Sequence, residues 1–346
     1  MNPNAKLITL FSLILGSITV ISSNHWALTW TGLEINTLAI IPMISKSHHP
    51  RAIEASIKYF LVQATASAII LLSSTINAWS TGQWDITQLT NHTSSLLLTT
   101  AIAMKLGLVP FHFWFPEVLQ GSSLVTALLL STLIKLPPLS ILLITFNSLN
   151  PTLLTTLALI STALGGWMGL NQTQTRKIMA FSSISHLGWM ALIITYTPKL
   201  TLLTFYLYTL LTSSIFLTLN TSNTTKLSTL MTSWTKNPPL NATLMLTLLS
   251  LAGLPPLTGF LPKWLIIQEL TKQEMTTAAL TIALFSLLNL FFYLRLTYYS
   301  TITLPPNTTN YTKHWFLNKT TNPLPALFAS LSILLLPISP AIPAII

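Results

Sequence analysis

The chain of 346 residues contains no cysteine. A disulfide framework, a cysteine-ligated zinc site and a cysteine-held iron–sulfur cluster are therefore excluded within it. Charge is also scarce, because only 6% of the residues are Asp, Glu, Lys or Arg, against about 25% in soluble globular proteins. So few charges cannot cover a surface that faces water, but they are sufficient for a surface that faces lipid.

Apolar residues make up 51% of the chain, and the mean hydropathy is +0.65. Several windows of about 20 residues carry no charge, which is the length that crosses the hydrocarbon core of a bilayer. The sequence therefore predicts an all-α polytopic membrane protein, with residues 1–346 as a single membrane domain. The net charge is +10, but the basic residues are scattered singly, so we expect no nucleic-acid partner.

Hydropathy predicts about eleven transmembrane helices. They are placed at residues 7–22, 26–45, 56–78, 94–112, 122–146, 151–170, 177–197, 199–220, 240–262, 275–300 and 323–344. The first apolar segment is interpreted as a retained span, because no small-residue cleavage site of a signal peptide follows it.

The loops between these spans differ in charge. One side of the membrane receives the N-terminus and every second loop, with eleven Lys and Arg residues, and the opposite side receives two. By the positive-inside rule, the N-terminus is expected on the matrix or cytoplasmic side and the C-terminus on the other.

Glu34, Lys105 and Lys135 fall inside the predicted spans, and Lys263 directly follows the span 240–262, within a proline-interrupted segment. A charge at the bilayer centre costs roughly 2.5–3.5 kcal/mol on insertion scales, so such residues usually mark an ion or proton path. A lysine whose distance from a carboxylate can change binds its proton with a switchable affinity, and Glu34 with Lys105 is a candidate for such a pair. The alternative is that the lysines extend to the membrane interface and that Glu34 is a structural ion-pair partner.

Two histidines lie in the same kind of segment. His112 is part of "GLVPFHFWFPEV", and His186 is part of "RKIMAFSSISHLGWM", close to the hydroxyls of Ser182, Ser183 and Ser185. Both are candidate proton relays. The alternative for each is a structural histidine whose hydrogen bonds are satisfied locally.

An internal repeat connects the segments that begin at Gly107 and Gly253, which share Gly-Leu-x-Pro and a second proline at an offset of 146 residues. The offset spans five predicted helices, an odd number, so the second copy is expected to be inverted. Inverted repeats with a proline-interrupted helix in each half are typical of transporters. We expect residues 1–146 as the first repeat, 147–300 as the second and 323–344 as a final helix.

Prolines also follow Lys135. Pro137 and Pro138 have no N–H to donate to the carbonyls of Leu133 and Ile134. These carbonyls are therefore expected to be free to solvate the lysine inside the membrane.

The segments "AMKLGLVPFHFWFPEVLQGSSL", "TRKIMAFSSISHLGW" and "LAGLPPLTGFLPKW" resemble the signature segments of the antiporter-like subunits of respiratory complex I and of multisubunit sodium/proton antiporters. The resemblance covers essentially the whole chain. It implies two inverted five-helix repeats with a broken helix in each, and a multi-pass protein of the mitochondrial inner membrane. With the positive-inside rule, its N-terminus is expected in the matrix and its C-terminus in the intermembrane space.

The resemblance also implies roles for the buried groups. In chain order these are Glu34 and Lys105 as a switchable pair, His112, Lys135 as the central lysine, His186, and Lys263 on the second broken helix. No cofactor is expected in this chain, since NAD, FMN, iron–sulfur clusters and ubiquinone belong to other subunits. Consistently, the sequence has no dinucleotide-binding or phosphate-binding glycine motif.

The expected function is that of a proton-translocating subunit of NADH:ubiquinone reductase with no redox centre of its own. Its expected partners are the other membrane-arm subunits, including neighbouring antiporter-like subunits, together with the lipid bilayer and the transported protons. Two alternatives are a subunit of a cation/proton antiporter, which would exchange Na⁺ for H⁺ without NADH, and a purely structural membrane-arm subunit.

Overall fold

The computed structural model describes residues 3–235, 238–302 and 323–335, and its regular elements over these ranges are helices. Seven stretches of the described residues are long and apolar enough to cross a membrane: six single helices and the interrupted helical stretch Leu124–Ile144. The contacts divide the chain into two units. Unit 1 comprises Met1–Thr162 and His186–Pro198, and unit 2 comprises Ala163–Ser185 and Lys199–Ile346.

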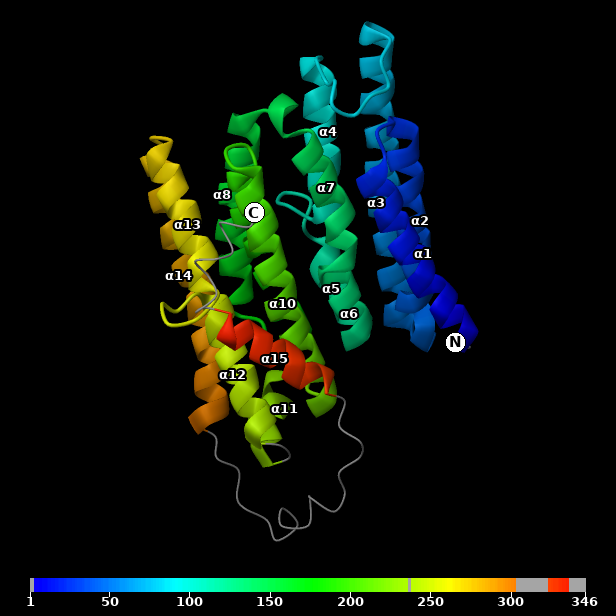
Figure 1. Cartoon of the computed structure of the whole chain (residues 1–346). Coiled ribbons are helices and arrows are strands. Elements are labelled where there is room, and N and C mark those ends of the chain that lie inside the picture. The colour runs from blue at the N-terminus through cyan, green and yellow to red at the C-terminus, as the bar shows by residue number, and fades with distance from the viewer. Residues whose placement is uncertain (1–2, 236–237, 303–322, 336–346) are drawn as a thin grey trace. The chain divides into compact units, whose positions relative to one another are not determined.

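The helices of unit 1 come from the first half of the chain (Figure 1). Their bounds are Pro3–Ser22 for α1, Trp26–Ile44 for α2, Pro50–Thr81 for α3, His92–Leu106 for α4, Trp114–Gly121 for α5, Leu124–Ser131 for α6 and Leu136–Ile144 for α7. Short 3₁₀ turns occupy Ser45–Ser47 (η1), Leu133–Lys135 (η2) and Phe146–Ser148 (η3).

Helices α8 (Pro151–Gly169) and α9 (Thr175–Ile193) contribute residues to both units. The helices of unit 2 are α10 Pro198–Ser222, α11 Leu227–Met231, α12 Pro238–Ala252, α13 Phe260–Lys272, α14 Thr276–Ile302 and α15 Leu324–Leu334, with the 3₁₀ turn η4 at Thr232–Thr235.

Helices α1 and α2 cross at small residues. A Cβ atom added at Gly16 would collide with the side chain of Asn36, and one added at Gly32 would lie 2.5 Å from the hydroxyl of Thr19. In lipid, apolar burial does not drive helices together. Association depends instead on close van der Waals packing, which such small residues allow. The crossing fixes α2, the helix that carries Glu34.

Helix α3 packs against α2, α4 and α5 (Figure 1). Its buried face contains Ala55, Tyr59 and Gln63, spaced four residues apart as expected for one side of a helix. A Cβ atom at Gly121, the last residue of α5, would lie 2.6 Å from the Cβ of Ala55. The short helix α5 is therefore packed closely onto α3.

Both units contain the broken helix that the sequence predicts. Gly107 ends α4 with a φ of +77° and Gly253 follows α12 with a φ of +85°, a conformation that glycine adopts without a Cβ penalty. The offset of 146 residues between these glycines also separates the starts of α4 and α12 and the starts of α5 and α13.

The expected helix bounds need two corrections. The segments 94–112 and 240–262 are not continuous, because α4 ends at Leu106 and α12 at Ala252. Helix α3 begins at Pro50 rather than near residue 56, since His49 caps its first turn and proline suits the first helical position. Of the final helix expected at 323–344, Leu324–Leu334 is helical and residues 336–344 lie outside the described residues.

Candidate functional site

Lys105 lies in the last turn of α4 and is only 4% exposed. The helix ends at the next residue, Leu106, because the positive φ of Gly107 turns the chain away. The N–H of Gly107 donates to the carbonyls of Ala103 and Met104. A buried lysine thus lies in the last turn of a helix, the end that carries partial negative charge.

Two side chains from other helices donate hydrogen bonds to the carbonyls in the last turn of α4. Trp114 of α5 donates its indole N–H to the carbonyl of Met104 at 3.2 Å, and Gln63 of α3 donates its amide N–H to the carbonyl of Lys105 at 3.4 Å. The last carbonyls of a helix have no partner within it. These two bonds therefore satisfy the helix end and tie it to α3 and α5.

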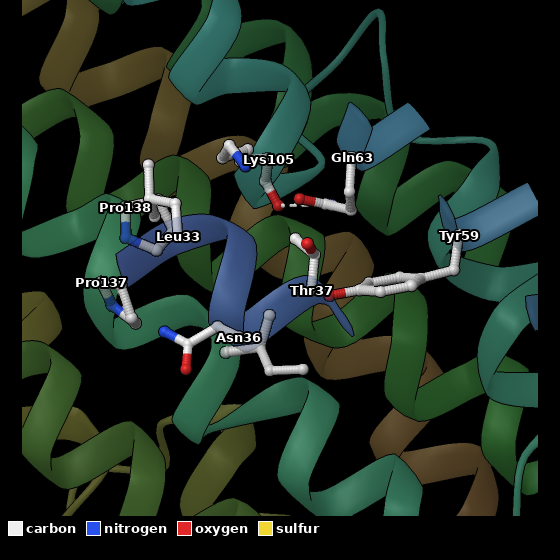
Figure 2. Close-up of a pocket in the computed structure, with 9 residues that line it drawn as sticks. Leu33, Asn36, Thr37, Tyr59, Gln63, Lys105, Pro137 and Pro138 are labelled. Atoms are coloured by element: carbon white, nitrogen blue, oxygen red, sulfur yellow. Dashed lines mark hydrogen bonds between the residues drawn. The ribbon is translucent and has the colours of Figure 1, made fainter. Parts of the chain in front are cut away.

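The side chain of Lys105 faces a small cavity (Figure 2). Its lining residues are Leu33, Asn36, Thr37, Tyr59, Gln63, Lys105, Ile134, Pro137 and Pro138. The volume open to the centre of a water molecule is about 10 Å³, so the cavity has room for about one water molecule.

Glu34 is partly buried on α2. Its carboxylate accepts a hydrogen bond from the hydroxyl of Thr37 at 3.1 Å. It interacts electrostatically with Lys105 and with Tyr59, but among the described residues no ion pair within 4.0 Å joins Glu34 to Lys105. The two candidate partners therefore lie in the same region without direct contact.

Lys135 is 2% exposed and lies in η2, where a 3₁₀ turn interrupts the membrane-crossing stretch between α6 and α7. Its ammonium group lies 4.5 Å from the ring centroid of Phe115, the geometry of a cation–π interaction. The expectation that the carbonyl of Leu133 is free was wrong, because the tighter 3₁₀ turn brings the N–H of Leu136 to that carbonyl.

Lys263 belongs to α13 in unit 2 and is 9% exposed. Its ammonium group donates to the carbonyl of Ala252, the last residue of α12, at 2.8 Å. Gly253 makes room for this bond, since a Cβ atom there would lie 2.9 Å from the Lys263 nitrogen. The lysine of the second half-helix therefore caps the first, where the helix end attracts a cation.

The two candidate histidines occupy different settings. His112 lies in the connection between α4 and α5, is 2% exposed, and has its ring centroid 4.2 Å from that of Phe113. His186 is partly buried on α9. The nearby serine hydroxyls donate to backbone carbonyls one turn earlier; these are the hydroxyls of Ser182, Ser183 and Ser185.

Charged residues and histidines of the site were predicted from the sequence, but four of its polar residues were not: Asn36, Thr37, Tyr59 and Gln63. The sequence did carry a signal for two of them. Tyr59 and Gln63 are polar residues within one predicted span, and they are four residues apart, so they lie on the same face of α3. Within the described ranges, no group of three or more His, Asp or Glu residues could hold a metal ion.

A membrane helix broken at a left-handed glycine in each half, with a buried lysine beside each break, is the architecture of a helical antiporter-type membrane protein. Comparison with known families gives the same class. Residues 23–289 match the membrane-domain model of NADH:quinone oxidoreductase and Mrp antiporter proteins. Residues 290–343 match the model of the NADH dehydrogenase subunit 2 C-terminus. The chain belongs to this family.

Full-length relatives define its group within the family. NADH-ubiquinone oxidoreductase chain 2 of Struthio camelus is 75% identical over 342 residues, and that of Gallus gallus is 72% identical over 342 residues. Both alignments cover 99% of this chain and 99% of the relative.

Solved structures share the fold. A chain of respiratory complex I from Thermus thermophilus, solved with bound aureothin, is 25% identical with a TM-score of 0.82, over 96% of this chain and 79% of that one. A chain of the membrane-bound sulfane sulfur reductase, an archaeal respiratory membrane complex, is 17% identical with a TM-score of 0.84, over 96% and 73%. A chain of the Mrp complex from Dietzia sp. DQ12-45-1b is 18% identical with a TM-score of 0.76, over 87% and 61%.

Proposed function

We propose that this chain is a proton-translocating, antiporter-like subunit of respiratory complex I, which couples redox energy to proton movement through buried charged residues. One observation carries the proposal. Lys105, Lys135 and Lys263, which are 4%, 2% and 9% exposed, each lie where a membrane helix is interrupted. Beside broken helix ends, backbone carbonyls and water can solvate a buried ammonium group, and the water can exchange protons with it.

The roles follow from position. Glu34 and Lys105 act as the switch, because the carboxylate attracts the ammonium group without touching it. Lys135, enclosed by protein and facing Phe115, stores the proton. Lys263 connects onward in unit 2, and His112 and His186 are relays. Moving one charge across the membrane costs about 2.3 kcal/mol per 100 mV, so these groups change protonation in step with a signal from the redox reaction.

The redox centres are assigned to other subunits, with NAD, FMN, iron–sulfur clusters and ubiquinone bound there. This chain assembles with other membrane-arm subunits, including neighbouring antiporter-like subunits, and lies in the mitochondrial inner membrane. Its N-terminus is placed on the matrix side and its C-terminus on the intermembrane-space side. The family membership and the asymmetric distribution of basic residues support this arrangement.

Glu34→Gln in the assembled enzyme tests the proposal. NADH oxidation and proton translocation are recorded separately in sealed vesicles, with Glu54→Gln on α3, whose side chain is 61% exposed, as the matched control. We expect Glu34→Gln to lower proton translocation at least severalfold and Glu54→Gln to leave it unchanged. Normal translocation in Glu34→Gln would contradict the proposal. Dependence of translocation on Na⁺ would instead favour a cation/proton antiporter.

A further inference from the structure

We propose that Thr37, Tyr59 and Asn36 form a water-holding proton relay between Lys105 and Glu34. The inference rests on the function proposed above for those two charged residues, and it adds three uncharged residues to the path. Thr37 would pass the proton, while Tyr59 and Asn36 would be positioning residues that hold the water.

Thr37 connects the two charged groups. It lines the cavity that Lys105 faces, and its hydroxyl is shared between the backbone carbonyl of Glu34 at 2.9 Å and the carboxylate of Glu34 at 3.1 Å. In Figure 2, Thr37 lies between Lys105 and Asn36, and the Tyr59 ring extends toward it from α3. Since no ion pair within 4.0 Å joins Lys105 to Glu34 in the described part of the chain, a proton needs an intermediate carrier in this arrangement.

The cavity gathers polar groups that lack partners. The ammonium nitrogen of Lys105, the hydroxyl of Tyr59 and both polar atoms of the Asn36 amide are buried and make no hydrogen bond to the described residues. Leaving such a group unsatisfied costs about 1–3 kcal/mol, and buried water is the usual partner. A cavity with room for about one water molecule, lined by three such side chains, is built to hold that water.

The proton step is balanced. An N–H bond of the Lys105 ammonium breaks as its proton joins the water oxygen, and the water passes a different proton to the oxygen of Thr37. The Thr37 hydroxyl in turn releases its own proton to the Glu34 carboxylate. The products are a neutral amine and a carboxylic acid, while the water and the threonine are unchanged. No oxidant or reductant takes part, and the reverse sequence restores the charged pair.

Thr37→Val and Thr37→Ser test the relay in the assembled complex. Valine keeps the branched shape but has no hydroxyl, whereas serine keeps the hydroxyl. We expect the number of protons translocated per NADH in sealed vesicles to fall at least threefold in Thr37→Val and to stay near the wild-type value in Thr37→Ser. Thr31→Val is the matched control, because Thr31 is exposed on the same helix and donates its hydroxyl only to the carbonyl of Leu28.

The possible results separate the relay from the proposed function. If Thr37→Val translocates normally while Glu34→Gln and Lys105→Met do not, the relay is wrong and the proposed function stands. If all three translocate normally, the proposed function fails as well. If Thr37→Val does not assemble, Tyr59→Phe decides instead, since it removes one oxygen atom. At least a twofold loss of protons per NADH supports the relay, and an unchanged value overturns it.

Discussion

The ammonium group of Lys263 is bonded to the carbonyl of Ala252 at 2.8 Å, whereas that of Lys105 makes no hydrogen bond to the described residues. Both lysines lie at the end of a broken helix, but the exposed carbonyls are satisfied differently. At the end of α4, the side chains of Gln63 and Trp114 donate hydrogen bonds to the carbonyls. At the end of α12, Lys263 itself is the donor. Lys105 is therefore available to exchange partners, while Lys263 is anchored.

Gly253→Ala should displace Lys263. The new methyl group would lie 2.9 Å from the lysine nitrogen, and a φ of +85° is strained for alanine. We expect a lower denaturation temperature of the detergent-solubilised complex and reduced proton translocation.

The control for this substitution is Gly82→Ala. Gly82 has a φ of +74°, but a Cβ atom there meets nothing within 4 Å, so the control reports backbone strain alone. If both variants lose translocation equally, the close approach of Gly253 to Lys263 is not needed for proton translocation.

Gln63→Leu should loosen the end of α4. The substitution leaves the buried carbonyl of Lys105 without its side-chain donor, and an unsatisfied buried group costs about 1–3 kcal/mol. We expect a measurable fall in the denaturation temperature of the complex and a lower proton yield per NADH. Gln83→Leu, at an exposed position after α3, should change neither. A Gln63→Leu enzyme as stable and as well coupled as the wild type would show that the bond is dispensable.

Phe115→Leu should weaken the environment of Lys135. The aromatic ring lies 4.5 Å from the lysine nitrogen, and a cation–π interaction is worth about 2 kcal/mol when the groups are desolvated. We expect reduced coupling of NADH oxidation to proton translocation, measured as the ratio of the two rates. Phe115→Trp should retain more of that coupling, because it keeps an aromatic ring beside the lysine.

The control is Phe291→Leu on α14, where the ring is 58% exposed. Equal coupling in Phe115→Leu and Phe291→Leu would contradict a role for the ring beside Lys135.

Much of this architecture could be predicted from the sequence. The burial of Lys105, Lys135 and Lys263 followed from their place in apolar windows, and the repeated glycine–proline segments predicted the two breaks. These signals are local, because hydropathy and backbone chemistry act over about one helix length.

The partners of these lysines could not be predicted in the same way. The bond from Lys263 to Ala252 depends on how α13 folds back on α12, and the cavity at Lys105 depends on which faces of α2, α3 and α7 meet. The error at Leu133 has a similar origin, since proline positions alone do not distinguish a 3₁₀ turn from an interrupted α-helix.

Lys135→Met in the assembled enzyme tests most directly whether buried charges in this chain carry protons. NADH oxidation and proton translocation would be measured separately in sealed vesicles, with Lys46→Met, an exposed lysine of η1, as the control. The expected result is normal assembly with a collapse of translocation or of coupled turnover in Lys135→Met and no change in Lys46→Met. Wild-type rates for both activities in Lys135→Met would contradict a proton-carrying role and favour a structural one.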